Sequence, residues 1–242
     1  MCIFDKTKQL NMEAVKDIIK LGYDDYSKEY DFLEEEVVSK PKKKAVSKPK
    51  KESNRKGVVS TSDYLDFDRA MRVGERLLKD DKKKILGLYI IVAINTGLRV
   101  GDVLKLRWEH FKDNRRGFII VTEGKTSKPR RIDLNESILK AVEQFTNVPL
   151  NSFIFKSQKG GVYTIQQINR LLKSTFEKEA KNLNISSHSL RKTFGRRVYS
   201  MNGESENALI YLSEMFQHSS MAITRRYLGI RQEELTNIYL NL

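Results

Sequence analysis

Apolar positions become frequent and periodic only from about residue 61 onward, so the packed part of the chain is expected to begin there. Apolar residues at helical spacing predict a helix over roughly 64–79, with Ser62 or Asp63 as its N-cap. The stretch over roughly 83–95 is apolar at almost every position. Such a stretch predicts a helix that is buried on all sides.

Glycines and short β-type runs mark the next elements. Gly97 is expected to end the apolar helix, and a short helix is expected to follow it as far as Leu106. The runs 118–121 and 131–134 have strand character and flank a turn that contains glycine and lysine. This arrangement predicts a β-hairpin over 117–134, and residues 153–155 are a candidate third strand.

Helical spacing resumes after the glycine pair at 160–161. The pattern predicts helices over about 164–182, 188–200, 205–216, 220–228 and 231–240. The predicted fold class is therefore mainly α with a small antiparallel β-hairpin (α+β).

The first sixty residues differ in composition from the rest. Residues 1–39 are expected to be a separate short element, since they include a segment of helical spacing and an acidic run that ends at Glu36. Residues 40–60 are rich in lysine. A lysine-rich segment cannot bury apolar surface, so we expect a disordered linker over 40–60, followed by one compact, mostly helical domain over 61–242. The linker is either a spacer or a tether to the DNA backbone, and the lysines expected to contact DNA are Lys42, Lys43, Lys44, Lys50 and Lys51.

Charge narrows the class of partner. The 242 residues carry a formal net charge of +14, which favours a polyanion such as nucleic acid over other partners. Cys2 is the only cysteine, so disulfide frameworks and cysteine-based zinc sites are excluded. No carboxylate cluster suggests a metal site, and no glycine-rich loop of the nucleotide-binding type occurs. Neither metal nor cofactor is expected, and with no long apolar segment we expect a soluble, cytoplasmic protein.

Three short clusters carry the candidate chemistry. They are Thr96-Gly97-Leu98-Arg99, then His188-Ser189-Leu190-Arg191, then His218-Ser219-Ser220 followed by Tyr227. Taken singly, each is compatible with an ordinary surface or core role. Their joint order resembles the signature of the tyrosine recombinase (phage integrase) family, from about residue 62 to the C-terminus. Residues 95–108, 187–194 and 215–229 resemble its three conserved boxes, although Gln217 stands where the family frequently has glycine.

The resemblance implies roles for five side chains. Arg99 and Arg191 would grip the scissile DNA phosphate, since a planar guanidinium pairs with two oxygens at once. Tyr227 would be the nucleophile and form a 3′-phosphotyrosyl link. His188 would accept its proton, and His218 would donate a hydrogen bond to the phosphate.

The resemblance also implies a lysine on the hairpin that protonates the leaving 5′-oxygen. Lys125 is the best match, and Lys128 is the alternative. Asp102 matches an acidic position that supports the first arginine box, and it is expected to orient a neighbouring group rather than react.

The implied function is site-specific cutting and rejoining of double-stranded DNA in a bacterium or phage. The family further implies a tetramer on DNA, with helix 231–240 docking on a neighbouring protomer, and accessory DNA-bending or directionality proteins. A non-catalytic DNA-binding regulator and a type IB topoisomerase-like activity are the alternatives, and a basic structural protein would explain the charge but not the clusters. The family usually has a helical DNA-binding domain before the catalytic one, and residues 1–60 are too few for it.

Overall fold

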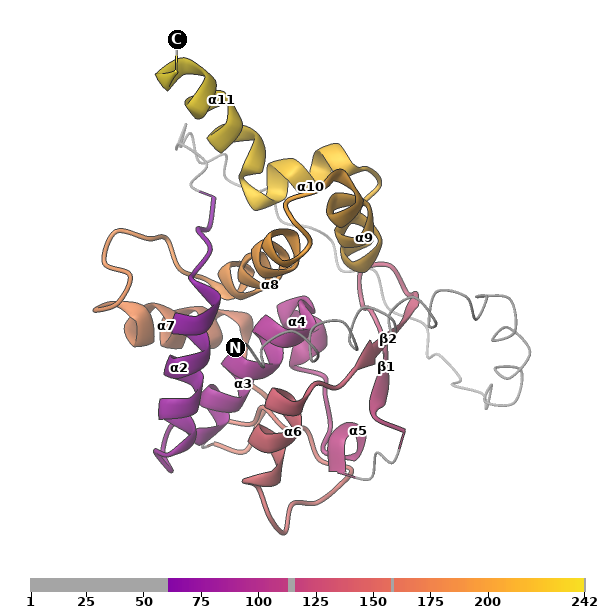
Figure 1. The fold of residues 1–242 in the computed structure, drawn as a ribbon. Helices are drawn as coiled ribbons and strands as arrows, with labels where there is room; N and C mark the ends of the chain where they lie inside the picture. Colours follow the sequence, from indigo (N-terminus) through magenta and orange to yellow (C-terminus); the bar gives the residue numbers. More distant parts are fainter. Residues whose placement is uncertain (1–60, 113–115, 158, 242) are drawn as a thin grey trace, which may run out of the picture. The chain divides into compact units, whose positions relative to one another are not determined.

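The computed structural model describes residues 61–112, 116–157 and 159–241 (Figure 1). The N-terminal element predicted over 1–39 and the linker over 40–60 lie outside the described residues, as do the five lysines expected to contact DNA. Within the described part, helices dominate and two strands form one antiparallel sheet. The predicted fold class is confirmed.

The first two described helices are α2 (Phe67–Leu78) and α3 (Lys84–Thr96). As predicted, α3 is buried along almost its whole length. The predicted cap of α2 was wrong, because Asp66 is the N-cap and accepts from the amide of Arg69. Ser62 and Asp63 instead bind a distant segment: the Ser62 hydroxyl lies 2.7 Å from that of Ser186, and Asp63 accepts from the Asn184 amide at 2.7 Å.

Gly97 ends α3 in the left-handed conformation, with φ of 60°, as its sequence position indicated. The next helix, α4 (Val100–Val103), is shorter than predicted and is followed by α5 (Glu109–Lys112). The backbone does not continue as a helix to Leu106, because the carbonyl of Leu106 pairs with a distant segment instead. It accepts from the amide of Ile154 at 3.0 Å.

The predicted hairpin is confirmed as β1 (Phe118–Thr122) and β2 (Pro129–Asp133), paired from Phe118 opposite Asp133 to Thr122 opposite Pro129. Its turn is closed by a 3.1 Å bond from the Glu123 amide to the Lys128 carbonyl. Residues 153–155 do not form a strand. They make a single bridge, Phe153 to Arg107, because Ile154 and Phe155 are both buried and do not alternate between two faces.

Two helices lie between the hairpin and the C-terminal part. Helix α6 (Glu136–Glu143), capped by Asn135, was not predicted. Helix α7 (Ile165–Phe176) begins with a capping box between Thr164 and Gln167, and it ends six residues before the predicted 182.

The last four helices agree with the sequence pattern. They are α8 (Ser187–Met201), α9 (Glu206–Phe216), α10 (Met221–Leu228) and α11 (Ile230–Leu240). Serines at 186, 205 and 220 cap the first three, as expected of a short hydroxyl at an N-cap. Helix α11 buries Ile230 but exposes its later apolar side chains, with Ile238 59% and Leu240 77% exposed.

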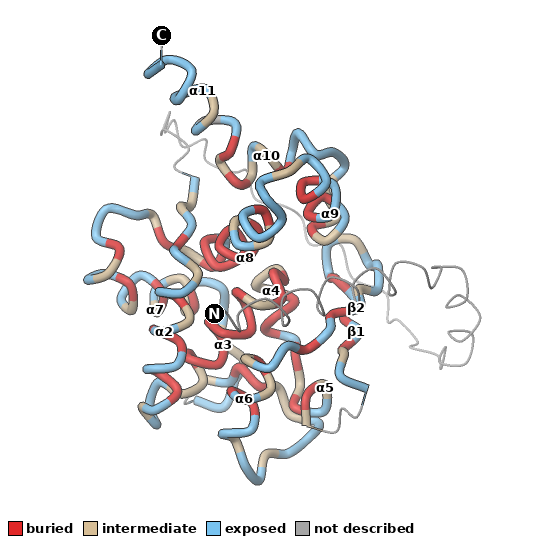
Figure 2. The backbone as a smooth tube through the Cα atoms, in the orientation of Figure 1, coloured by how far each residue is buried: buried red, intermediate tan, exposed pale blue. Residues whose placement is uncertain are grey.

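The buried residues form two clusters that meet at α8 (Figure 2). The larger one joins α2, α3, α6, α7 and the hairpin, and it includes Leu190 of α8. The smaller one joins α9 and α10 around Phe194 and Tyr199, further along α8. Gly97 and Gly195 allow α8 to pack closely against its neighbours. A Cβ on Gly97 would lie 2.3 Å from the ring of Phe194, and one on Gly195 would lie 2.6 Å from the side chain of Leu228. This junction of the two clusters positions the candidate site.

Candidate active site

The predicted site residues gather around the C-terminal end of α9. Arg99 precedes α4, and Arg191 lies on α8. His218 follows Gln217, the C-cap of α9, and Tyr227 lies on α10. Lys125 is in the hairpin turn, which reaches towards α9 in Figure 1. Residues separated by more than a hundred positions in sequence therefore converge.

The backbone carbonyl of Phe216 joins the two arginines. Nη2 of Arg99 donates to it at 3.0 Å, and Nη2 of Arg191 donates at 3.1 Å. Arg191 also donates from Nη1 to the carbonyl of Gly97 at 2.6 Å. Carbonyls at two helix ends thus hold the guanidiniums side by side.

Arg191 is almost fully buried, at 3% exposure. Its pKa is lowered to about 10, chiefly by burial; Tyr227 opposes this shift, and the neighbouring Arg99 contributes to it. A pKa of about 10 still leaves the group cationic at neutral pH. The site therefore keeps a buried positive charge, which favours an anionic ligand.

Tyr227 is half-buried among ring and cationic groups. Its ring centroid lies 5.6 Å from that of Phe216 and 5.5 Å from that of His218, and Nζ of Lys192 lies 5.4 Å from it. The hydroxyl is 3.5 Å from the carbonyl oxygen of His188, at the outer limit of a hydrogen bond. In this state the hydroxyl thus faces the backbone of His188.

Burial raises the pKa of Tyr227 to about 12, although the charges of Arg191 and Arg99 and a hydrogen bond from Arg191 act in the opposite direction. The phenol is therefore neutral at physiological pH. It becomes an effective nucleophile only when another group accepts its proton.

The two histidines of the site are held in the neutral form. Nδ1 of His218 lies 2.9 Å from the hydroxyl of Thr224. Burial and the charges of Arg191, Arg99 and Lys125 lower the pKa of His218 to about 4. The pKa of His188 is lowered by burial and by Arg191, Lys192 and Arg99. Both imidazoles are therefore free to accept a proton, although the surrounding positive charge disfavours their protonated forms.

A buried carboxylate that the sequence pattern did not indicate lies between two arginines. Glu123 is fully buried; it forms an ion pair with Arg99 and lies 3.4 Å from Nη1 of Arg130. Arg130 also donates to the carbonyl of Thr96 at 2.8 Å. Its pKa is lowered to about 10, first by burial and then by Arg99. No spacing rule points to this carboxylate, because Glu123 directly follows a strand and looks like an ordinary turn residue.

Asp102 contacts the lysine-bearing turn. Its Oδ1 accepts from the amide of Gly124 at 2.8 Å, so it holds the backbone directly before Lys125. The second carboxylate oxygen, Oδ2, is buried without a protein hydrogen bond. Lys125 itself is exposed, and its charge is among those that lower the pKa of His218. Lys128, the alternative, is also exposed and closes the turn through its carbonyl.

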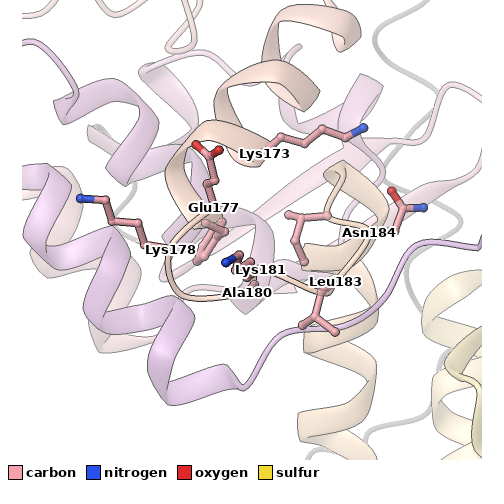
Figure 3. Close-up of a pocket in the computed structure, with 9 residues that line it drawn as sticks. Lys173, Glu177, Lys178, Ala180, Lys181, Leu183 and Asn184 are labelled. Carbon is pink, nitrogen blue, oxygen red and sulfur yellow. The ribbon is translucent and has the colours of Figure 1, made fainter.

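A separate depression of about 690 Å³ lies at the end of α7 (Figure 3). It is lined by Lys173, Phe176, Glu177, Lys178, Ala180, Lys181, Leu183, Asn184 and Ile185, none of which is a predicted site residue. The side chains of Lys173 and Lys178 extend in opposite directions, so the polar groups do not converge on a ligand (Figure 3). Its concavity does not make it the reactive centre.

Metal-binding groups and membrane spans are both absent from the described part of the chain. There, no group of three or more histidine, cysteine, aspartate and glutamate side chains is arranged to bind a metal ion. No helix in that part is long and apolar enough to cross a membrane.

Comparison with known proteins decides the family. The model of the phage integrase family matches residues 65–234 of this chain. The chain belongs to the phage integrase family. The probable integrase/recombinase YoeC of Bacillus subtilis is 29% identical over 177 residues, which cover 71% of this chain and 91% of that protein.

Other relatives of this integrase-family chain are tyrosine recombinases. One from Agathobacter rectalis is 26% identical over 156 residues, covering 62% of this chain and 49% of that protein. The chain thus spans about half the length of that relative. Among solved structures, XerA recombinase superposes with a TM-score of 0.54 at 22% identity, covering 75% of this chain and 65% of the other. XerH recombinase bound to its difH substrate gives 0.54 at 21% identity, covering 74% and 53%. These likenesses confirm the fold.

Proposed function

We propose that this protein is a site-specific DNA recombinase that cuts and rejoins strands through a covalent 3′-phosphotyrosyl intermediate. The observation that carries the proposal is the convergence of Arg99 and Arg191 on one carbonyl, beside the ring of Tyr227. Two neighbouring guanidiniums next to a phenol are suited to hold a phosphodiester while it is attacked. Family membership and the tyrosine recombinases among the relatives support the same function.

The arginines bind the scissile phosphate through their remaining N–H groups. A guanidinium has five donors, and the contacts of Arg191 to Gly97 and Phe216 engage two of its nitrogens. Both arginines are cationic, so they also stabilise the negative charge that develops at phosphorus in the transition state. The backbone carbonyls of Gly97 and Phe216 orient the two guanidiniums, which reduces the reorganisation needed to bind a phosphate.

The reaction then exchanges one phosphoester for another. The oxygen of Tyr227 attacks phosphorus, its proton passes to His188, and His218 donates a hydrogen bond to a phosphate oxygen. The bond from phosphorus to the 5′-oxygen breaks, and Lys125 protonates that oxygen. Attack by a 5′-hydroxyl on the phosphotyrosine reverses these steps. Because the ester energy is conserved, rejoining needs no ATP. Arg99 and Arg191 supply the charge stabilisation that a metal ion would otherwise provide.

Covalent capture tests this function. The protein is incubated with nicked duplexes drawn from DNA flanking its own gene, in the presence of a metal chelator, and the denatured sample is examined for an adduct. We expect an adduct with the wild type and none with Tyr227→Phe, which should still bind the DNA. Tyr211→Phe is the matched control, since Tyr211 is 48% exposed on α9.

Three results would contradict the proposal. An adduct formed by Tyr227→Phe would remove Tyr227 as the nucleophile. Tight binding by the wild type without any adduct would favour a non-catalytic DNA-binding regulator. Relaxation of supercoiled DNA without exchange of partners would instead indicate a type IB topoisomerase-like activity.

Assembly and the N-terminal region complete the proposal. The exposed apolar residues of α11, Leu235, Ile238 and Leu240, suit docking on a neighbouring protomer in a tetramer on DNA. Removing residues 235–242, which leaves the buried Ile230 in place, should then abolish strand exchange while single-strand cleavage continues. The lysines of 40–60 are proposed to contact DNA backbone, so deleting residues 1–56 should flatten the salt dependence of binding. An unchanged salt slope would leave the lysine-rich segment as a spacer.

A further inference from the structure

Gln217 has an unusual backbone for its residue type. It ends α9 in the left-handed region, with φ of 51° and ψ of 47°, between Phe216 and His218. A side chain with a Cβ is disfavoured there, and glycine is the residue that adopts this conformation freely. A glutamine that accepts this conformation beside reacting groups points to a function for its side chain.

The side chain of Gln217 contacts the hairpin turn. The hydroxyl of Thr126 donates a hydrogen bond to its amide oxygen, Oε1, across 91 positions of sequence. Both residues are half-buried. Glycine at 217 would relax the backbone but could not make this bond. The bond therefore accounts for a glutamine at a position that glycine would fill more easily.

Thr126 is the residue directly after Lys125, and the turn is also held directly before Lys125. Asp102 accepts from the amide of Gly124 at 2.8 Å, and Glu123 pairs with Arg99. The exposed Lys125 side chain thus starts from a backbone that is fixed on both sides. Fixing both neighbours reduces the volume in which its ammonium group can move.

We propose that Gln217 and Thr126 form a positioning pair that places Lys125 at the leaving 5′-oxygen. The inference rests on the proposed function and adds two residues that do not themselves touch the reacting atoms. Because Gln217 lies between Phe216 and His218, the pair also fixes the lysine relative to the groups that hold the phosphate. Loss of the pair should therefore impair proton donation to the leaving group rather than attack by Tyr227.

The test compares two leaving groups. Cleavage is measured on a nicked duplex with the normal 5′-bridging oxygen and on one with sulfur at that position, because a thiolate leaves without being protonated. With the oxygen substrate, Thr126→Val and Gln217→Met should each be slower by about tenfold or more, a fraction of the effect of a general acid. With the sulfur substrate, each should stay within about twofold of the wild type. Lys125→Ala should show the same pattern more strongly.

Three controls separate positioning from folding. Thr122→Val makes the same chemical change on the same hairpin at an exposed site, and it should leave both rates unchanged. The double variant Thr126→Val with Gln217→Met should be no slower than the single variants, because each substitution alone already removes the hydrogen bond between the two side chains. Gln217→Gly should melt no lower than the wild type yet lose rate on the oxygen substrate.

Several outcomes would overturn the inference. Equal losses on the two substrates would reduce the pair to a structural role, and wild-type rates on both would leave it with none. In either case the wild type still cuts DNA, so the proposed function stands. If the wild type cuts neither substrate, the proposed function fails and the inference fails with it.

Discussion

Arg191 contacts Phe216 in two ways. Its Nη2 donates to the Phe216 carbonyl at 3.1 Å, and its guanidinium carbon lies 4.2 Å from the centroid of the Phe216 ring. A planar cation over an aromatic face is attracted by the ring quadrupole, and burial strengthens the attraction. Phe216, at the end of α9, therefore fixes the position of the guanidinium through its carbonyl and the orientation of the guanidinium through its ring.

Replacing Arg191 by lysine should keep the positive charge but lose the planar, forked arrangement of donors. An ammonium group cannot donate to Gly97 and Phe216 while it also presents a fork to a phosphate. We expect cleavage to slow by about 10²–10³-fold, with a much smaller loss in DNA binding. Single-turnover cleavage and binding titrations measure the two effects. Arg197→Lys on the exposed side of α8 is the control, and a loss below about tenfold in Arg191→Lys would argue against a phosphate clamp.

Neutralising Glu123 should destabilise the folded protein. Glu123→Gln leaves Arg99 and Arg130 close together without their buried counter-charge. Removing one partner of a buried ion pair costs about 3–5 kcal/mol in the free energy of unfolding. Asp133→Asn, which removes an exposed carboxylate that pairs with Arg131, should cost below about 1 kcal/mol. Urea unfolding compares the two, and equal losses would contradict the structural role of Glu123.

Replacing either of two nearby glycines, Gly97 or Gly101, by alanine should affect the stability of the protein very differently. In Gly97→Ala the new Cβ would lie 2.3 Å from the ring of Phe194 at a φ of 60°. Steric overlap and left-handed strain together should cost on the order of 3 kcal/mol of stability. In Gly101→Ala the Cβ has no atom within 4 Å, so the higher helix propensity of alanine should be neutral or slightly stabilising. Similar melting temperatures for the two variants would refute this account of Gly97.

Stability should depend on pH through His218. Its pKa is about 4 in the folded protein against an ordinary value of 6.5, so the unfolded chain binds more protons between these values. The contribution is therefore fully present above about pH 6.5 and is lost as the pH falls towards 4. Lowering the pH from 7 to 5 should reduce the melting temperature more for the wild type than for His218→Asn. Equal reductions would show that other groups cause the pH dependence.

The hydrophobic pattern and the order of motifs predict much of this fold and site. Helix α3, the break at Gly97 and the hairpin follow from local rules. A helix buried on all sides is apolar throughout, a left-handed cap favours glycine, and paired strands flank a turn, so each can be recognised from the sequence. Boundaries follow the pattern less closely: α6 was missed, and Asp66 rather than Ser62 or Asp63 caps α2. Those details depend on distant partners, as the bond from Asp63 to the Asn184 amide illustrates.

The sequence by itself determined the family, through the residue types and order of the three boxes, and it predicts which side chains carry the chemistry. Only the tertiary structure decided how these side chains are held. The ion pair of Glu123 with Arg99, the shared carbonyl of Phe216 and the bond from Thr126 to Gln217 all join residues from different elements of the fold. The physical reason is that these contacts depend on how the hairpin packs against the Arg99 segment and α9, and on how α9 packs against α8. Local spacing carries no information about which groups will meet.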